Sequence, residues 1–328
     1  MSSSLLEVRG LSTVYHTLAG PVRAVDGVDL VVERGETFGI VGESGSGKTT
    51  LVMSLMRLIK PPGRILKGVV VLDGEDLFRL PRSDMPARRG RDLALIPQSA
   101  MRALNPVIPV DRQVGEAIIT HQATSRKVAL HAARERLQEV GIPPERCSAY
   151  PHELSGGMRQ RCVIAMAVAN EPKLVIADEP VSGLDVVVQA RILRLISELR
   201  ESQGLSMILV SHDLPMVAKI CERIAVMYAG RIVEVGKADA IFERPLHPYT
   251  RALVEAIPQA RGPKQTLRSL PGDPPDLHHL PPGCNFQPRC PAAFADCAKV
   301  DPSLEEVEPG RRAACLLYTD ERKQKPDE

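Results

Sequence analysis

The sequence is poor in aromatic residues and has no long apolar run. Its 328 residues include five Tyr, five Phe and no Trp. No stretch reaches the roughly eighteen consecutive apolar residues of a membrane-spanning helix, so any membrane role should come through a partner. Glu7 and Arg9 interrupt the amino-terminal segment where a secretory signal would need an apolar core. We therefore expect a cytosolic protein.

The chain also lacks a strong charge of either sign. Forty-two Lys and Arg face forty Asp and Glu, which leaves a formal charge of +2. This balance gives no case for a nucleic-acid partner. The hydrophobic fraction of 44% is that of an ordinary globular protein and excludes disorder and collagen. Seven cysteines are too few for a disulfide scaffold in a chain of this length. The length has room for one large domain and a smaller one, or for two medium domains.

The pattern of the chain changes near its carboxyl end. Eleven of the 28 prolines lie between Pro258 and Pro309, so this stretch is not expected to be mostly helical. Upstream, short β-branched runs alternate with longer amphipathic runs, which predicts an α/β fold with a sheet covered by helices. Predicted strands cover 28–32, 37–41, 69–72, 93–96, 174–177, 207–210 and 224–228. Predicted helices cover 48–59, 113–121, 126–140, 155–170, 187–201 and 214–220.

A glycine-rich loop follows the predicted strand 37–41. The segment GESGSGKT fits the phosphate-loop pattern G-x-x-x-x-G-K-[ST] and is followed at once by a helix. The glycines let backbone N–H groups turn inward around an anion, and the helix N-terminus adds partial positive charge. Lys48 is expected on the β and γ phosphates, and Thr49 on Mg²⁺. The predicted nucleotide-binding residues here are Gly42, Glu43, Ser44, Gly45, Ser46, Gly47, Lys48, Thr49 and Thr50.

Two carboxylates follow the apolar strand 174–177. Asp178 and Glu179 would emerge at the carboxyl edge of a buried parallel sheet, where ligands bind. We expect Asp178 to hold Mg²⁺, through water, and Glu179 to orient or deprotonate the attacking water.

The segment LSGGMRQR precedes this strand. Ser155 can cap a helix whose two glycines expose backbone N–H groups, an arrangement suited to a γ-phosphate. Because the chain's own phosphate loop already fills that role, a dimer in which each segment completes the partner's site is the economical arrangement. The residues assigned to this signature are Leu154, Ser155, Gly156, Gly157, Met158 and Gln160.

LSGGMRQR shortly before LVIADEP resembles the signature and Walker B pair of ATP-binding-cassette (ABC) ATPases, over residues 5–236. The resemblance implies a P-loop NTPase fold with a RecA-like core, an antiparallel β subdomain and a helical subdomain at about 97–171. The family's pattern further implies that Tyr15 stacks on adenine and that Gln98 touches Mg²⁺ and senses the membrane partner. It places Asp185 at the dimer interface and His212 near the γ-phosphate. With Glu179 and His212 both present, we expect an active ATP hydrolase.

Residues 237–328 are predicted to form a separate, small Pro- and Cys-rich extension. Cys284, Cys290, Cys297 and Cys315 have five, six and seventeen residues between them, wider than the spacing usual for zinc hairpins. Ordinary buried thiols, zinc and an iron–sulfur cluster are the alternatives. HPYT and this cysteine pattern resemble the extension of oligopeptide and dipeptide importer ATPases, and the resemblance favours a [4Fe–4S] cluster.

The resemblance as a whole implies a subunit that energises an ABC importer for oligopeptides or dipeptides. It would sit at the cytoplasmic face of the membrane with a second ATPase subunit, identical or related, and two permease subunits, fed by a solute-binding protein. Nickel, glutathione and oligosaccharides are alternative cargoes within the same subfamily. A DNA-maintenance or ribosome-associated ABC ATPase is the alternative from another class.

Overall fold

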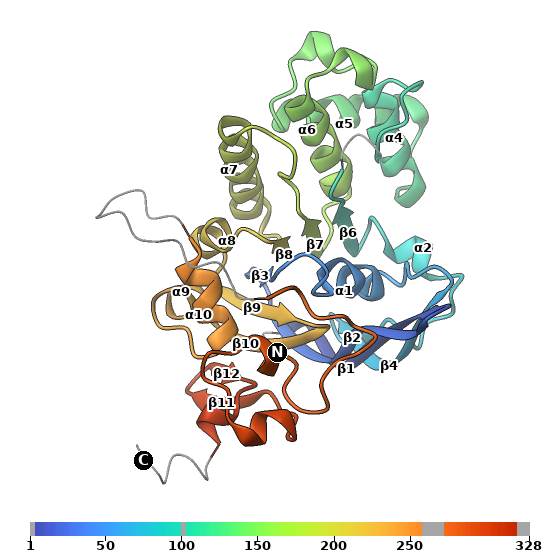
Figure 1. The fold of residues 1–328 in the computed structure, drawn as a ribbon. Coiled ribbons are helices and arrows are strands. Elements are labelled where there is room, and N and C mark those ends of the chain that lie inside the picture. Colours follow the sequence, from blue (N-terminus) through green and yellow to red (C-terminus); the bar gives the residue numbers. More distant parts are fainter. Residues whose placement is uncertain (1–3, 100–102, 258–271, 320–328) are drawn as a thin grey trace. The chain divides into compact units, whose positions relative to one another are not determined.

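The computed structural model describes residues 4–99, 103–257 and 272–319 (Figure 1). The chain forms two compact units from interleaved segments. One unit, the signature unit, comprises Met1–Leu5, Val32–Glu36 and Asp73–Leu209. The other, the phosphate-loop unit, comprises Leu6–Val31, Thr37–Leu72 and Val210–Glu328. The boundary predicted at residue 236 remains a prediction.

The signature unit combines buried parallel strands with a group of helices. β6 (Leu93–Ile96) pairs in parallel with β7 (Leu174–Asp178), and β8 (Ser206–Ser211) lies on the other side of β7. Every residue of β7 is buried, as its apolar sequence predicts. Helices α4, α5 and α6 pack against one another (Figure 1). Among the described residues, the helices of this unit and its short strand include α2 (Met85–Arg88), α4 (Val110–His121), α5 (Arg126–Glu139), α6 (Gly156–Val168), α7 (Val186–Gln203) and β5 (Glu75–Asp76).

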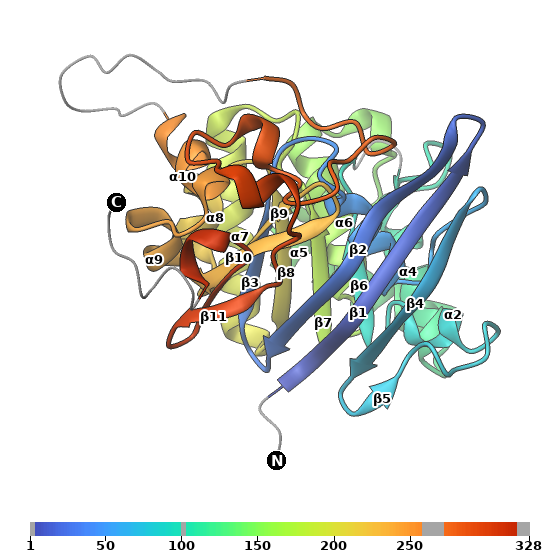
Figure 2. The same cartoon turned by 60° about the horizontal axis from the view of Figure 1, so that its bottom comes forward.

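The phosphate-loop unit contains two groups of strands. In the first, the long strand β1 (Ser4–Thr17) lies between β2 (Gly20–Glu33) and β4 (Gly63–Leu72) and pairs antiparallel with β4 (Figure 2). The second has the order β11-β12-β10-β9-β3, in which only β3 and β9 pair in parallel. Its strands are β3 (Thr37–Val41), β9 (Arg223–Tyr228), β10 (Arg231–Lys237), β11 (Glu305–Glu308) and β12 (Arg311–Ala313). The unit's helices are α1 (Lys48–Leu55), α8 (Leu214–Ile220), α9 (Ala238–Glu243) and α10 (Pro248–Glu255).

Several elements differ from the sequence prediction. Helix α1 ends at Leu55 instead of residue 59, because Arg57 has a left-handed φ of 50° and two prolines follow. Strand β1 and strand β10 were not predicted. In β1 the buried face follows no simple alternation, since its register with β4 shifts near Ser12. In β10 the polar residue Glu234 interrupts the apolar run although it is fully buried.

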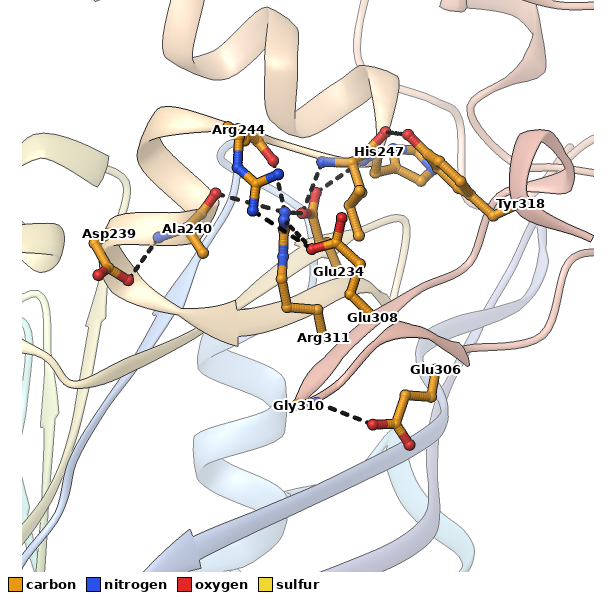
Figure 3. Close-up of polar contacts among 11 residues, drawn as sticks. Glu234, Asp239, Ala240, Arg244, His247, Glu306, Glu308, Gly310, Arg311 and Tyr318 are labelled. Carbon is orange, nitrogen blue, oxygen red and sulfur yellow. Dashed lines mark hydrogen bonds and ion pairs between the residues drawn. The ribbon is translucent and has the colours of Figure 1, made fainter. Parts of the chain in front are cut away.

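The buried ion pair between Glu234 and Arg311 joins the carboxyl-terminal strands to β10 (Figure 3). Arg311 Nη2 donates to Glu234 Oε1 at 3.2 Å and to the carbonyl of Arg244 at 2.6 Å. The same Glu234 carboxylate accepts the backbone N–H groups of Leu246 and His247. This network compensates the buried charges with hydrogen bonds, as a buried ion pair requires. The network fixes both β12 and the segment before α10 to strand β10.

Within the part of the chain that the structure describes, no helix combines the length and the apolar character needed to cross a membrane.

Candidate nucleotide site

The phosphate loop lies between β3 and α1 in the phosphate-loop unit. Gly47 takes the N-cap position of α1 with φ of 103°, a left-handed conformation that favours glycine. The side chain of Lys48 is buried, and its Nζ donates to the carbonyls of Gly42 at 2.7 Å and Glu43 at 2.8 Å. The ammonium group is therefore held inside the curve of the loop, where phosphate oxygens can exchange with these carbonyls.

Backbone of neighbouring segments closes tightly around the loop. A Cβ atom at Gly42 would lie 2.2 Å from the carbonyl oxygen of Met227, and one at Gly47 would lie 2.1 Å from that of Ala24. These separations leave no space for a side chain. Packing thus requires glycine at positions 42 and 47, and the loop has the form of an anion cradle.

Residues from the carboxyl-terminal part of the chain contact the loop at Glu43. The N–H of Glu43 donates to the hydroxyl of Tyr249 at 2.9 Å. Its carboxylate accepts two hydrogen bonds from Arg289, of 2.8 Å to Oε2 and 3.1 Å to Oε1. Burial raises the pKa of Tyr249, so the hydroxyl stays neutral. Sequence reasoning missed these two residues, because 206 and 246 positions separate them from Glu43.

The two predicted carboxylates lie at the end of β7 in the signature unit. Asp178 is the last residue of the strand and is buried. Glu179 has a φ of 47°, a conformation that is uncommon outside glycine and that concentrates at functional sites. Its Oε2 accepts a hydrogen bond of 3.1 Å from Nε2 of Gln98, which follows β6. The structure therefore brings Gln98 and the candidate base together, as expected of neighbouring parallel strands.

The signature segment begins α6. Ser155 is exposed and caps the helix, since its Oγ accepts the N–H of Met158 at 3.3 Å. A hydroxyl that accepts from the backbone still has its own hydrogen to donate to a phosphate. Leu154 and Gln160 are buried, at 4% and 3% exposure, so they support the segment from inside. Gly156, Gly157 and Met158 are partly exposed.

Asp185 caps the next helix of the same unit. Its carboxylate accepts the N–H of Val188 at 3.0 Å at the start of α7. Two apolar side chains beside it face solvent, with Val186 at 80% exposure and Val187 at 61%. They leave apolar surface exposed beside Asp185.

The other two predicted residues lie in the phosphate-loop unit. Tyr15 is partly exposed near the end of β1, where it pairs with Gly63 of β4. The ring of Tyr15 packs over Gly63, since a Cβ atom placed on Gly63 would lie 2.7 Å from Cε1 of Tyr15. His212 is exposed in the turn between β8 and α8.

The predicted site residues thus fall into two groups, one in each compact unit. The phosphate-loop unit holds Tyr15, residues 42–50 and His212. The signature unit holds Gln98, Asp178, Glu179, residues 154–160 and Asp185.

The predicted metal cluster finds no support. Among residues 4–99, 103–257 and 272–319, no three His, Cys, Asp or Glu side chains are arranged to hold a metal ion. The four thiols of the extension are neighbours: burial, together with Cys284, Cys290 and Cys297, raises the pKa of Cys315 to about 12. We therefore assign neither a [4Fe–4S] cluster nor zinc to this segment.

Two sequence families match the chain. Residues 25–182 match the family described as ABC transporter, and residues 233–297 match the oligopeptide/dipeptide transporter C-terminal region. The chain is 43% identical to the dipeptide transport ATP-binding protein DppD of Escherichia coli, over 97% of this chain and 98% of the relative. It is 42% identical to the oligopeptide transport ATP-binding protein OppD of the same organism, over 98% and 95%.

Solved structures agree with these matches. A dimeric post-hydrolysis state of the ATP-binding cassette MJ0796, bound to ADP and Pi, superposes with a TM-score of 0.64 and 26% identity. The alignment covers 71% of this chain and 98% of that one. The fold and the phosphate loop thus define an ATP hydrolase of the ABC type, which confirms the predicted fold class. The chain belongs to the family of ABC transporter ATP-binding proteins that carry the oligopeptide/dipeptide transporter C-terminal region.

Proposed function

We propose that this chain is the ATP-hydrolysing subunit of an importer for dipeptides or oligopeptides. One observation carries the proposal: the similarity to DppD and OppD extends over nearly the whole of both chains and includes the carboxyl-terminal region named for this transport class. In this role the subunit lies at the cytoplasmic face of a membrane against two permease subunits, with a solute-binding protein delivering the peptide.

The chemistry follows from the two groups of site residues. Lys48 neutralises the β and γ phosphates, with the loop amides, and Tyr15 stacks on adenine. Glu179 takes the proton of the attacking water, and Gln98 positions its carboxylate, a role supported by the hydrogen bond between them. His212 contacts the γ-phosphate.

Three oxygen donors are proposed for magnesium. The hydroxyl of Thr49, the amide oxygen of Gln98 and the carboxylate of Asp178 are the hard ligands that this ion prefers. When bound, it neutralises charge on the phosphates.

A head-to-tail dimer completes each site. In this arrangement Ser155 and the amides of Gly156 and Gly157 from one chain face the phosphates held by the other chain. The exposed hydroxyl of Ser155 and the exposed pair Val186 and Val187 beside Asp185 support such an interface. ATP binding then closes the dimer, and hydrolysis lets it reopen.

The turn of residues 105–109, which follows Gln98 in the sequence, is proposed to dock the permease. Gln113, which is buried, fixes this turn: it accepts the N–H of Asn105 at 2.8 Å and donates to the carbonyls of Asn105 at 3.0 Å and Ile108 at 2.6 Å. The turn presents Val107 to solvent at 76% exposure. A rigid turn carrying one apolar side chain is suited to contact a short helix of a partner.

The test is uptake by the reconstituted complex of this chain with its permeases. We expect ATP-dependent accumulation of labelled di- and oligopeptides in proteoliposomes that carry the solute-binding protein. Glu179→Gln is the control: it should bind ATP and lose turnover by at least about 100-fold, because the general base is removed. Uptake of nickel, glutathione or oligosaccharide in place of peptide would show that the assigned substrate class is wrong. ATPase activity stimulated by nucleic acid, with no permease recovered, would contradict transport.

A further inference from the structure

The carboxyl-terminal extension contacts the phosphate loop through a buried ion pair. Arg289 approaches Glu43 with both terminal nitrogens, a geometry that joins a guanidinium to a carboxylate by two parallel hydrogen bonds. The side chain of Arg289 is 6% exposed and that of Glu43 is 24% exposed. Both residues belong to the phosphate-loop unit.

An aromatic cluster fixes the arginine. Its Cζ lies 5.8 Å from the centre of the Tyr228 ring, which is within cation–π range. Phe286, three residues before Arg289, packs edge-on against Tyr228 at 5.2 Å between ring centres and lies 5.4 Å from Tyr249. Tyr249 in turn accepts the N–H of Glu43. The guanidinium is therefore held in place by side chains on both sides of the pair.

Glu43 is a residue of the cradle itself. Its carbonyl oxygen accepts from Lys48 Nζ at 2.8 Å, so its carboxylate is carried by the loop that must receive a polyphosphate. An uncompensated carboxylate at this position would repel ATP, since like charges at short range and reduced dielectric interact strongly. Arg289 supplies the opposite charge from 246 positions along the chain.

We propose that Arg289 is a positioning residue of the nucleotide site, through which the extension sets ATP affinity by neutralising Glu43. The extension thereby acts on the ATPase of its own chain, independently of the transported cargo. Tyr249 assists by fixing the backbone of Glu43.

The proposal is tested by ATP binding to the purified full-length chain, measured by displacement of a fluorescent ATP analogue. Arg289→Gln should weaken ATP binding about tenfold at low ionic strength, because Glu43 keeps its charge. The loss should be smaller at high salt and smaller for ADP, which carries less charge. Arg289→Lys should retain most of the affinity.

The double variant separates charge from simple loss of structure. Glu43→Gln combined with Arg289→Gln removes both charges and should bring ATP affinity back to within about twofold of the original chain. Glu43→Gln alone should tighten binding, because Arg289 then adds net positive charge near the phosphates. If Arg289→Gln does not fold, the direction in which Glu43→Gln changes ATP affinity tests the proposal: tighter binding supports it, and unchanged or weaker binding contradicts it.

Arg311 provides a matched control. Its side chain is also 6% exposed and also forms a buried ion pair, but with Glu234, outside the loop. Arg311→Gln should lower thermal stability and leave ATP affinity within about twofold. The proposal is overturned if Arg289→Gln binds ATP normally, if the double variant remains as weak as Arg289→Gln, or if Arg311→Gln weakens binding equally.

Discussion

Gly47 combines a left-handed conformation with a close approach of backbone. Its φ is 103°, and a Cβ atom would lie 2.1 Å from the carbonyl oxygen of Ala24. We expect Gly47→Ala to lower the free energy of unfolding by at least about 2 kcal/mol, because conformational strain and steric overlap add. Chemical denaturation measures the change.

Gly45 is the control for this prediction. It also has a positive φ, of 79°, but nothing lies within 4 Å of a Cβ placed there. Gly45→Ala should therefore cost only the conformational strain, about 1 kcal/mol. Equal losses in the two variants would show that the contact with Ala24 does not matter.

His247 makes stability depend on pH. Burial lowers its pKa from 6.5 to about 3, and its Nδ1 accepts the N–H of Tyr249 at 3.0 Å. Below pH 6.5 the unfolded chain therefore binds a proton that the folded chain does not bind. The free energy of unfolding should fall as the pH falls, from about 6.5 towards 3. His247→Asn removes the titrating group.

The measurement is denaturant unfolding of both proteins at two pH values on either side of 6.5. Between values one unit above and one unit below, the original chain should lose about 1 kcal/mol more than the variant. Identical losses would contradict a neutral, buried imidazole. The comparison uses the change in the free energy of unfolding with pH. The hydrogen bond that His247→Asn also deletes lowers stability equally at both pH values, so it does not affect this comparison.

At the scale of elements, the turn of residues 105–109 is predicted to couple the ATPase to the permease. Val107→Arg places a charge on the exposed apolar position without touching Gln113, which holds the turn. We expect ATP hydrolysis by the isolated subunit to be unchanged and transport by the complex to fall at least about tenfold, as for loss of a central apolar contact.

Val128 provides the matched control in the same unit. It is 59% exposed on α5 and lies outside the proposed docking turn. Val128→Arg should leave both hydrolysis and transport near their original values. If the two variants transport equally well, residues 105–109 do not form the docking region.

Some elements were predictable and others were not, for reasons visible in their burial. β7 is apolar and fully buried, and α8 covers the predicted residues 214–220. In both elements the local sequence pattern is sufficient to predict the secondary structure. Strand β12 could not be predicted, because its three residues are two arginines and one alanine, and it exists through pairing with β10 and β11. Its Arg311 is stabilised by Glu234, which pairs with it across 77 positions.

At the scale of the whole molecule, the proposed head-to-tail dimer makes a complementation prediction. A dimer of one Lys48→Ala chain and one Ser155→Phe chain has one site with both defects and one intact site. Such mixed dimers should therefore hydrolyse ATP, at up to about half the original rate. Either variant by itself should be inactive. ATPase assay of tagged, purified heterodimers tests this.

The control places both substitutions on one chain and pairs it with an unaltered chain. Each site of that dimer then has one defect, so no activity is expected. If each site were formed within a single chain, the two results would be reversed.

The motifs of the nucleotide site are visible in the sequence alone. The phosphate loop, the signature and the Walker B carboxylates each consist of neighbouring residues, so short segments already contain their donors and charges. The tertiary structure decided what surrounds them. It placed Arg289 and Tyr249 on Glu43, and it left the four cysteines without an arrangement that can hold a metal within the described residues. Contacts between residues more than 200 positions apart depend on packing of the whole unit, which no local pattern contains.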